Sequence, residues 1–393
     1  MKILATGMGW FGTRPGGLNH YFADYLKAMT DMGHTVEGLL SAEGPLDGAP
    51  PYITDVAGGA VRLDPYRRMK AFSETVRRRV ADVAPDVFNP HFALYAFLIT
   101  RNMLPDRVPI VTHFHGPWAY ESRVEDSAGP LVRYVRFRVK RSIERMTYRR
   151  SDAFIVLSQY FRDMLSDCFG IPKERIHVVP GAVDTERFRP AENREALRAE
   201  LGVGGCKVLF CVRRLVRRMG IGNLIRAFAS VVREHPEARL FVAGSGPLKE
   251  ELEELIGRLG LGGHVRLLGR VSDEELVRWY QAADFSIVPS VDLEGFGLVT
   301  VESLACGTPV LGTPRGGTKE ILAGFSPGFL FDDATPEAMA GKLLDVLEGR
   351  IIAPDREACR RHVLRHYTWA HAARAITAIF EQAIEQRKER AKA

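Results

Sequence analysis

Short apolar, β-branched runs alternate with helical stretches along most of the chain, and this alternation constrains the fold more than any other feature. Strands that alternate with helices favour parallel sheets covered by helices on both faces. The series occurs twice, so the sequence predicts an α/β protein of two doubly wound, Rossmann-like domains. The expected strands are 2–7, 35–40, 86–91, 110–115, 153–158 and 177–181, followed by 207–212, 239–244, 265–270, 285–290 and 309–313.

The length of 393 residues suits two domains, each large enough for a core of its own. The first series ends near Arg189–Leu201, where Pro190 and a polar, acidic stretch interrupt the pattern. We therefore expect one domain over residues 1–190 and a second one from residue 191. Ligands of doubly wound sheets bind beyond the carboxyl ends of the strands. Two such domains facing each other across a cleft would suit an enzyme with two substrates.

Composition is that of an ordinary globular protein, with 46% hydrophobic and 26% charged residues. The first residues read as a strand, because their apolar run is too short for a signal peptide. No apolar run reaches the roughly 18 residues that a membrane-spanning helix needs. The five cysteines are scattered without a C-x-x-C pair, which favours free thiols over a structural zinc site. Together these features predict a cytoplasmic protein.

The net charge of +6 is concentrated in one part of the chain. Residues 1–190 hold 26 Lys and Arg against 21 Asp and Glu, whereas residues 191–393 hold 28 against 27. The excess lies in Arg133–Arg150, where Glu144 is the only acid. No nucleic-acid-reading motif accompanies it, so we expect no nucleic-acid partner. The segment is either a helix that contacts an anionic acceptor or the inner face of the membrane, or a solvated basic face.

The segment Glu294–Gly307 combines a glycine loop with a short helix, and it follows a predicted strand. The loop Gly295–Gly297, with Phe296 at its centre, precedes apolar residues at helical spacing. The backbone N–H groups of Gly297, Leu298 and Val299 would therefore lie at the positive end of a helix dipole. Such a helix N-terminus is a phosphate-binding site.

Two carboxylates flank this predicted phosphate site. Glu294 precedes the loop, and Glu302 lies in the second turn of the helix. Carboxylates repel a phosphate unless hydroxyl groups of the same ligand donate hydrogen bonds to them. A sugar on one side of a diphosphate and a ribose on the other would supply those hydroxyls, so the segment predicts a nucleotide-sugar site. The alternative is that both glutamates are solvated surface residues.

Two glycine motifs lie near the N-terminus. Gly7–Gly12 matches G-x-G-x-x-G, but that fingerprint requires a helix to open at its third glycine. Because Thr13–Pro15 intervene before the expected helix Leu18–Met32, a dinucleotide site is disfavoured. The pair Gly16 and Gly17, directly before the helix, is better interpreted as a second loop that approaches a phosphate. A plain turn is the alternative.

Polar residues follow several of the predicted strands. Arg213–Gly220 (RRLVRRMG) offers guanidinium groups suited to a diphosphate, although a solvated loop would also collect arginines. His115 ends a strand, where it could bind a sugar hydroxyl or move a proton, unless it is structural. His113 shares its sheet face and competes for that role. Trp118 and Tyr120 would stack on an acceptor or pack inside the domain.

Several common phosphate-site motifs are absent from the sequence. The nearest approach to D-x-D is the D-x-E of Asp292–Glu294, and neither a P-loop nor a G-x-S-x-G nucleophile elbow occurs. We therefore expect no metal and no cofactor. Arginines and helix dipoles would then neutralise the leaving diphosphate.

In order along the chain, these segments resemble glycosyltransferase family 4, whose members are retaining enzymes with the GT-B fold. The strongest match is E-x7-E from Glu294 to Glu302, and Gly16-Gly17 supports it. Further matches lie at 112–116, 156–164, 178–188, 242–248, 267–276 and 367–373. The resemblance covers nearly the whole chain.

The resemblance implies roles on the donor side. Glu302 would hold the ribose hydroxyls, and Glu294 with the backbone of Phe296–Leu298 would hold the donor sugar. Arg214 would bind the diphosphate, and Gly17 would approach it from the first domain. In this family a lysine usually lies five residues after that arginine, whereas this chain has Met219. Arg213 or Arg218 would then have to compensate.

Further roles follow from the same resemblance. Arg270 and Val271 would frame the nucleotide base, and His115 would lie beside the reacting sugar. The helix after Trp369 would cross back onto the first domain, so that residues 370–393 join 1–190 and the second domain ends at 369. A second departure is Gly181-Ala182, where the family usually has Asn-Gly.

The predicted function is metal-independent, retaining transfer of a sugar from a nucleoside diphosphate donor to an acceptor hydroxyl. A UDP-sugar is the first expectation and a GDP-sugar the second, with a carbohydrate, lipid-linked or small-molecule acceptor in glycan, glycolipid or small-glycoside biosynthesis. No residue is an obvious covalent nucleophile. We therefore expect front-face attack, with His115 and Glu294 positioning and stabilising. The alternatives are a nucleotide-sugar epimerase of the same fold, a non-catalytic nucleotide-sugar-binding protein and, more remotely, an NAD oxidoreductase.

Overall fold

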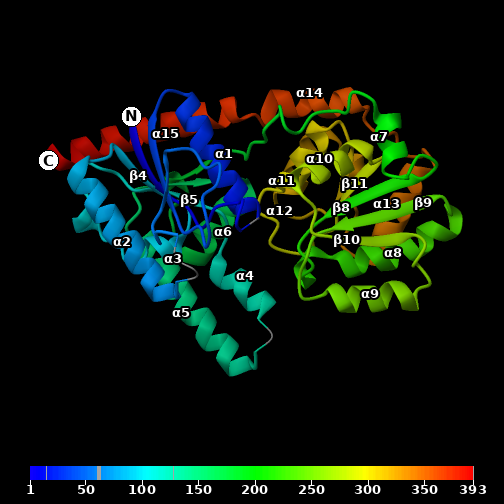
Figure 1. Ribbon diagram of the computed structural model, residues 1–393. Coiled ribbons are helices and arrows are strands. Elements are labelled where there is room, and N and C mark those ends of the chain that lie inside the picture. The colour runs from blue at the N-terminus through cyan, green and yellow to red at the C-terminus, as the bar shows by residue number, and fades with distance from the viewer. Residues whose placement is uncertain (15, 60–62, 127, 393) are drawn as a thin grey trace. The chain divides into compact units, whose positions relative to one another are not determined.

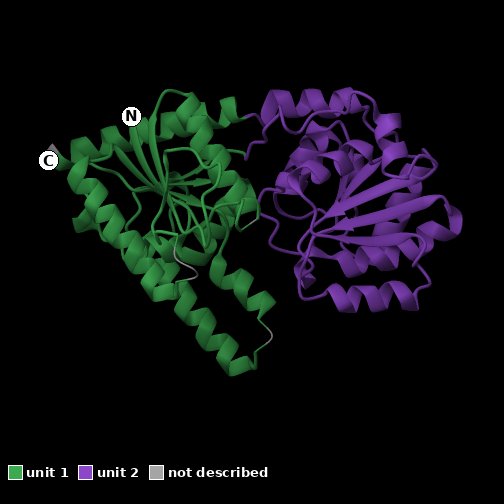
Figure 2. Ribbon diagram, viewed as in Figure 1, with its two compact units in different colours: residues 1–180, 369–393 green, residues 181–368 purple. Residues whose placement is uncertain are grey.

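The chain forms two compact units, each described by itself below. The computed structural model describes residues 1–14, 16–59, 63–126 and 128–392. Figure 2 shows unit 1, residues 1–180 and 369–393, in green and unit 2, residues 181–368, in purple. Figure 1 labels the helices and several of the strands of both units.

The observed boundary lies earlier than the expected one at residue 190. Residues 181–190 belong to unit 2 because hydrogen bonds hold them there. The N–H of Val183 donates to the carbonyl of Tyr367 at 3.0 Å, and Arg360 donates to the carbonyl of Phe188 at 2.6 Å. Pro190 therefore lies inside unit 2 and not at the passage between the units.

Unit 1 contains parallel strands in two adjoining sheets. One sheet has the order β3-β2-β1-β4 and the other β5-β6-β7, and a parallel bridge between Phe88 and Ile110 joins them. The strands are β1 (Lys2–Thr6), β2 (Thr35–Leu40), β3 (Ile53–Asp55), β4 (Val87–Pro90), β5 (Val111–Phe114), β6 (Ala153–Val156) and β7 (Ile176–Val178). The predicted strands of this half are confirmed. Strand β3 was not predicted, because three residues are too few to show an alternating pattern.

Helices cover the sheets of unit 1 (Figure 1). They are α1 (Gly17–Asp31), α2 (Pro65–Asp82), α3 (Ala93–Ala96), α4 (Trp118–Glu125), α5 (Pro130–Tyr148), α6 (Gln159–Phe169) and α15 (Trp369–Lys392). Polar side chains start several of them: Asp64 caps α2, and Ser158 caps α6. Helix α15, which follows unit 2 in sequence, packs on α1 and buries Ile376 and Phe380 completely.

Unit 2 has one five-stranded parallel sheet of order β10-β9-β8-β11-β12. Its strands are β8 (Lys207–Val212), β9 (Ala238–Ala243), β10 (Val265–Gly269), β11 (Phe285–Val288) and β12 (Val310–Gly312). All five were predicted, with small differences at their ends. The order reverses between β8 and β11, and loops at the carboxyl ends beside such a reversal are where doubly wound sheets bind ligands.

Helices pack on both faces of this sheet (Figure 1). They are α7 (Arg194–Glu200), α8 (Ile221–Glu234), α9 (Lys249–Arg258), α10 (Asp273–Ala282), α11 (Leu298–Ala305), α12 (Gly316–Phe325), α13 (Pro336–Leu347) and α14 (Arg356–His366). Helix α8 contacts α9 and α13, whereas α11 contacts α10 and α14. The predicted capping box from Ser272 to Glu275 starts α10. Within the described ranges, no helix is long and apolar enough to span a bilayer.

Candidate functional site

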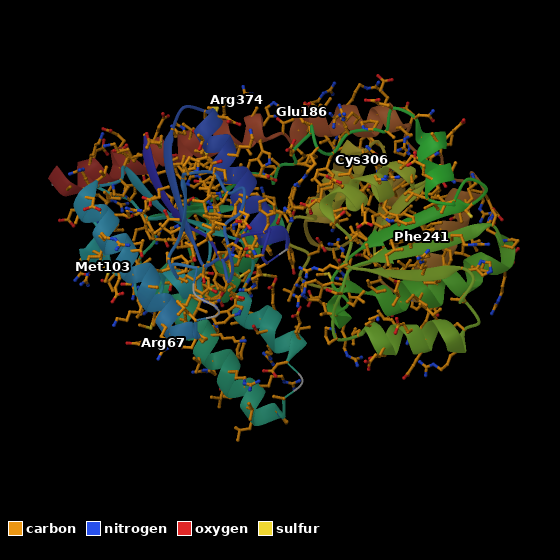
Figure 3. All side chains as sticks on the ribbon, in the orientation of Figure 1. Arg67, Met103, Glu186, Phe241, Cys306 and Arg374 are labelled. Atoms are coloured by element: carbon orange, nitrogen blue, oxygen red, sulfur yellow. The ribbon has the colours of Figure 1, made fainter. Side chains whose placement is uncertain are left out.

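Strand β11, a glycine loop and helix α11 follow one another as the sequence predicts. Gly297 is the N-cap of α11, with a φ of 85° in the left-handed region that favours glycine. A Cβ atom there would lie 2.3 Å from Oγ1 of Thr318, so a side chain has no room. The backbone therefore turns tightly into α11, whose first N–H groups belong to Leu298 and Val299. Figure 3 marks the other end of this helix, at Cys306.

Glu294 is buried, which contradicts the alternative that it is a solvated loop residue. Its side chain is only 6% exposed. The carboxylate lies 3.1 Å from Nη2 of Arg213 and accepts a hydrogen bond from Oγ of Ser290 at 2.6 Å. Because burying an unpaired carboxylate is very unfavourable, the nearby arginine offsets the cost of burying Glu294.

Glu302, the second carboxylate, is half-buried on α11. It accepts a hydrogen bond from the hydroxyl of Tyr280 at 2.9 Å. Burial, together with the nearby Glu302 carboxylate, raises the pKa of Tyr280 well above its ordinary value, so the phenol remains a donor. A carboxylate can accept several hydrogen bonds. The contact with Tyr280 therefore orients Glu302 and occupies only part of its capacity to accept hydrogen bonds.

The arginines after β8 differ in their surroundings. Arg213 is buried against Glu294, and Arg218 is buried and donates to the carbonyl of Leu293 at 3.2 Å. Arg214, the residue that the family resemblance favours for the diphosphate, is exposed. Met219 packs in the core of unit 2, and its sulfur lies 3.8 Å from Oγ of Ser290. Two of the four arginines of this segment, Arg213 and Arg218, thus hold the loop that carries Glu294.

Arg270 and Val271 lie beyond the carboxyl end of β10. Arg270 is exposed and Val271 is half-buried. Among the described residues, no hydrogen bond or ion pair connects Arg270 to the loop around Glu294. Strand β10 is an edge strand, separated from β11 by β9 and β8. Arg270 and Val271 therefore lie at the same end of the sheet as the loop around Glu294 but are separated from it by two strands.

A glycine pair that the sequence analysis missed packs against this loop. Gly316 and Gly317 begin α12, and the N–H of Gly317 donates to the carbonyl of Glu294 at 3.1 Å. A Cβ atom on Gly316 would lie 1.7 Å from that carbonyl oxygen. Oγ1 of Thr318 lies 2.9 Å from Oγ1 of Thr300, which ties α12 to α11. A glycine pair after a predicted strand, the signal used for Gly16 and Gly17, could have identified this second loop.

His115 of unit 1 belongs to a cluster of three histidines. Its Nε2 lies 3.0 Å from Nδ1 of His91, whose Nε2 lies 2.8 Å from Oδ1 of Asn89. His113 is almost fully buried and contacts the same asparagine at 3.0 Å, whereas His115 remains half-buried. Asn89 and His91 were missed as site residues. They lie at the carboxyl end of a predicted strand, and that position could have drawn attention to them.

Burial determines the protonation of these histidines. It lowers the pKa of His91 and of His113 well below the ordinary value and that of His115 to about 3. For His91 and His113, the neighbouring imidazoles add to this effect. All three rings are therefore neutral at pH 7, and each carries one proton.

The two glycine motifs near the N-terminus precede α1. The backbone carbonyl of Trp10 accepts hydrogen bonds from the N–H groups of Thr13 and Arg14. A turn therefore lies at the G-x-G-x-x-G match, where the fingerprint needs a helix. Helix α1 begins at Gly17, one residue before its predicted start, and Gly16 is its N-cap. Both glycines are exposed. Pro15 lies outside the described residues.

Trp118 and Tyr120, the expected acceptor residues, lie on α4. Tyr120 packs edge-on against Phe137 of α5, with ring centroids 5.1 Å apart, beside a core cluster of unit 1. Trp118 is half-buried under the ammonium group of Lys140 at 5.0 Å. Both side chains therefore pack within unit 1.

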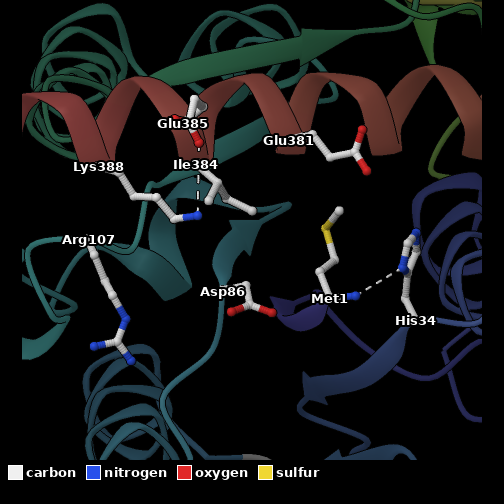
Figure 4. Close-up of a pocket in the computed structure, with 8 residues that line it drawn as sticks. All are labelled: Met1, His34, Asp86, Arg107, Glu381, Ile384, Glu385 and Lys388. Atoms are coloured by element: carbon white, nitrogen blue, oxygen red, sulfur yellow. Dashed lines mark hydrogen bonds and ion pairs between the residues drawn. The ribbon is translucent and has the colours of Figure 1, made fainter.

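A separate pocket of unit 1 lies beside α15. Figure 4 shows Met1, His34 and Asp86 facing Glu381 and Lys388 of that helix. Met1, His34 and Asp86 precede β1, β2 and β4, so this pocket lies at the amino ends of the strands. His115 follows β5 and lies at the opposite edge, where doubly wound sheets bind ligands.

Comparisons with known proteins agree with this geometry. Residues 15–187 match the family model Glycosyltransferase Family 4, and residues 193–365 match the model Glycosyl transferases group 1. A D-inositol 3-phosphate glycosyltransferase of Corynebacterium jeikeium is 30% identical over 400 residues, which cover 93% of this chain and 92% of that protein. The chain belongs to glycosyltransferase family 4.

Two further comparisons extend this result. A GDP-mannose-dependent alpha-(1-6)-phosphatidylinositol monomannoside mannosyltransferase of Mycolicibacterium smegmatis is 31% identical over 254 residues. That match covers 63% of this chain and 66% of the relative, just under two thirds of its length. The crystal structure of HepE from Anabaena in complex with UDP has a TM-score of 0.73 at 20% identity, covering 97% of this chain and 100% of that one. The family-4 enzyme thus has the GT-B fold and is a nucleotide-sugar glycosyltransferase.

Proposed function

We propose that this glycosyltransferase moves a hexose from a nucleoside diphosphate sugar to an acceptor hydroxyl, with retention of configuration and without a metal ion. The observation that carries the proposal is the segment from Glu294 to Glu302. It presents the N-terminus of α11 between a buried, ion-paired carboxylate and a half-buried one oriented by Tyr280. A diphosphate at the helix N-terminus would bring a sugar to Glu294 and a ribose to Glu302.

The proposed mechanism uses charges that are already fixed in the fold. The N-termini of α11 and α12 meet through Thr300 and Thr318, and both would stabilise the negative charge that develops on the leaving diphosphate. Glu294 is held by Arg213 and Ser290, so it is placed to orient the sugar and not to attack it. We therefore propose front-face attack, in which the leaving phosphate takes the proton of the acceptor hydroxyl.

Donor binding to Glu302 provides the direct test. Hydrogen bonds to charged groups contribute about 1.5–3 kcal/mol, so Glu302→Ala should weaken donor affinity about 10- to 100-fold. Tyr280→Phe keeps the ring and the carboxylate but removes the orienting hydroxyl, so its effect should be smaller. Calorimetric titration with the donor nucleotide measures both. Unchanged affinity in Glu302→Ala would refute the ribose assignment.

The donor and the acceptor are proposed from the similarity to known proteins. We place a UDP-sugar first, since the HepE structure contains UDP, and a GDP-sugar second, since one relative is named as GDP-mannose-dependent. The relatives' names point to inositol-containing or lipid-linked acceptors. Thermal-shift measurements with UDP, GDP, ADP and their sugars identify the base, because a ligand that binds the folded state raises the melting temperature. Product analysis with the donor alone would reveal an epimerase.

We also propose that α5 places the enzyme peripherally on the inner face of the cytoplasmic membrane. The helix exposes a stripe of apolar side chains four residues apart: Leu131 is 75% exposed, Val135 52% and Val139 55%. Exposed arginines lie between them, at Arg133, Arg136 and Arg138, and Arg145 is exposed further along the helix. An exposed apolar stripe flanked by basic residues matches the interfacial region of an anionic bilayer.

Vesicle binding tests this proposal. The protein should sediment with vesicles that contain phosphatidylglycerol and not with phosphatidylcholine alone, and salt should weaken the binding. The triple variant Leu131→Ser, Val135→Ser, Val139→Ser should lose at least about tenfold in vesicle affinity, since each removes buried apolar area. Ile352→Ser, which alters an 89% exposed side chain of unit 2, is the matched control. Equal sedimentation of all three proteins would refute the contact.

A further inference from the structure

A row of hydrogen bonds leads from the backbone of β5 to His115. The side-chain amide of Asn89 donates to the carbonyl of Val111, and its Oδ1 lies 2.8 Å from Nε2 of His91. Nδ1 of His91 lies 3.0 Å from Nε2 of His115. Asn89 is completely buried and His91 is 2% exposed, so water does not compete for these contacts. The row ends at His115, whose Nδ1 has no hydrogen-bond partner among the described residues.

The chemistry of each group determines the direction of this row. A backbone carbonyl can only accept, so the atom of Asn89 beside Val111 is the amide nitrogen and the other is the carbonyl oxygen. The second N–H of the same amide group faces Nδ1 of His113 at 3.0 Å, so His113 accepts there. Oδ1 of Asn89 accepts, so His91 must carry its proton on Nε2.

The proton positions on His91 and His115 follow, because a neutral imidazole has one nitrogen that donates and one that accepts. With its proton on Nε2, His91 presents a lone pair at Nδ1. His115 must then donate from its own Nε2, and its Nδ1 is left with a lone pair. The row therefore selects one tautomer of His115.

We propose that Asn89 and His91 are positioning residues that hold His115 with its proton on Nε2, so that Nδ1 accepts a hydrogen bond from a hydroxyl of the reacting sugar. The inference rests on the proposed sugar transfer, and on the place beside the reacting sugar that the family resemblance implies for His115. A sugar hydroxyl can donate to a lone pair, whereas the opposite tautomer would present an N–H to the same hydroxyl. Neither Asn89 nor His91 is placed in contact with substrate; each acts through His115.

Two substitutions of His91 separate positioning from packing. In His91→Asn, the amide oxygen can take the place of Nδ1 and accept from His115, so we expect kcat within about threefold of the wild type. In His91→Leu, no acceptor remains, so kcat should fall about 10- to 100-fold while the KM for the donor changes little. A purely structural role predicts the reverse order, because a buried leucine is tolerated better than a buried amide with unpaired groups.

Nitrogen-15 NMR of the histidine side chains reads the tautomer without any substrate. We expect the proton of His115 on Nε2 in the wild type and in His91→Asn, and a mixture of tautomers in folded His91→Leu. A proton on Nδ1 in the wild type would overturn the inference, as would full activity of folded His91→Leu. Full activity of His115→Ala would instead refute the proposed role of His115, so the two failures can be distinguished.

Discussion

At the scale of single residues, Arg213 offsets the cost of burying the side chain of Glu294 inside unit 2. The two side chains are 8% and 6% exposed and lie 3.1 Å apart. Removing one partner of a buried ion pair costs about 3–5 kcal/mol, because the other charge is left unpaired. We expect Arg213→Met to lower the free energy of unfolding of unit 2 by that amount. Hydrogen exchange of unit 2 in increasing urea measures the loss.

A neighbouring arginine supplies the control for this prediction. Arg217 is 76% exposed and pairs with Glu251 at 3.3 Å on the surface, where an ion pair contributes less than about 1 kcal/mol. Arg217→Met should therefore leave unit 2 almost unchanged. The double variant Arg213→Met, Glu294→Leu should regain most of the stability without regaining activity. Equal losses in Arg213→Met and Arg217→Met would contradict the buried pair.

At the scale of elements, Glu144 connects α5 to the start of α4. Its carboxylate accepts from the N–H groups of Trp118 at 2.9 Å and Ala119 at 3.0 Å, and from the hydroxyl of Tyr148 at 3.2 Å. Glu144 is completely buried, and burial raises its pKa to about 7. Glu144, the only acid in the basic segment Arg133–Arg150, is thus the residue that anchors α4 to α5. No local sequence pattern could indicate this role.

The raised pKa predicts how this helix pair responds to pH. A carboxyl group whose folded pKa lies above its unfolded value of 4.5 contributes stability that is fully present below pH 4.5. That contribution is lost as the pH rises through about 7, and it amounts to about 3 kcal/mol. We expect amide protection at Trp118 and Ala119, corrected for intrinsic exchange, to fall between pH 5 and pH 8. In Glu144→Gln, which does not titrate, protection should be independent of pH.

At the scale of the whole molecule, unit 1 is completed by a helix that follows unit 2 in sequence. Phe380 and Ile376 of α15 are completely buried, and Thr377 lies 2.9 Å from Nε2 of His34. Truncating a buried phenylalanine costs about 3–5 kcal/mol. Phe380→Ala should therefore lower the stability of unit 1 and leave that of unit 2 unchanged. Calorimetry combined with hydrogen exchange separates the two, and Gln382→Ala, at an exposed position, is the control.

Local patterns in the sequence were sufficient for most of the architecture. Strand and helix periodicity, the capping box at Ser272 and the glycine loop at Gly297 depend on residues that are close together in the chain. The family resemblance added the glycosyltransferase activity. The boundary at residue 180 and strand β3 could not be predicted, since both depend on hydrogen bonds to distant segments.

The sequence by itself determined the fold class, the order of the strands along the chain and the types of residue at the ends of those strands. Only the tertiary structure decided which partners those residues have: Arg213 with Glu294, Tyr280 with Glu302, and Asn89 with His91 and His115. The physical reason is the range of the interactions. Periodicity acts over one or two turns, whereas a buried charge or imidazole takes its protonation and its role from whichever group the folded chain places about 3 Å away.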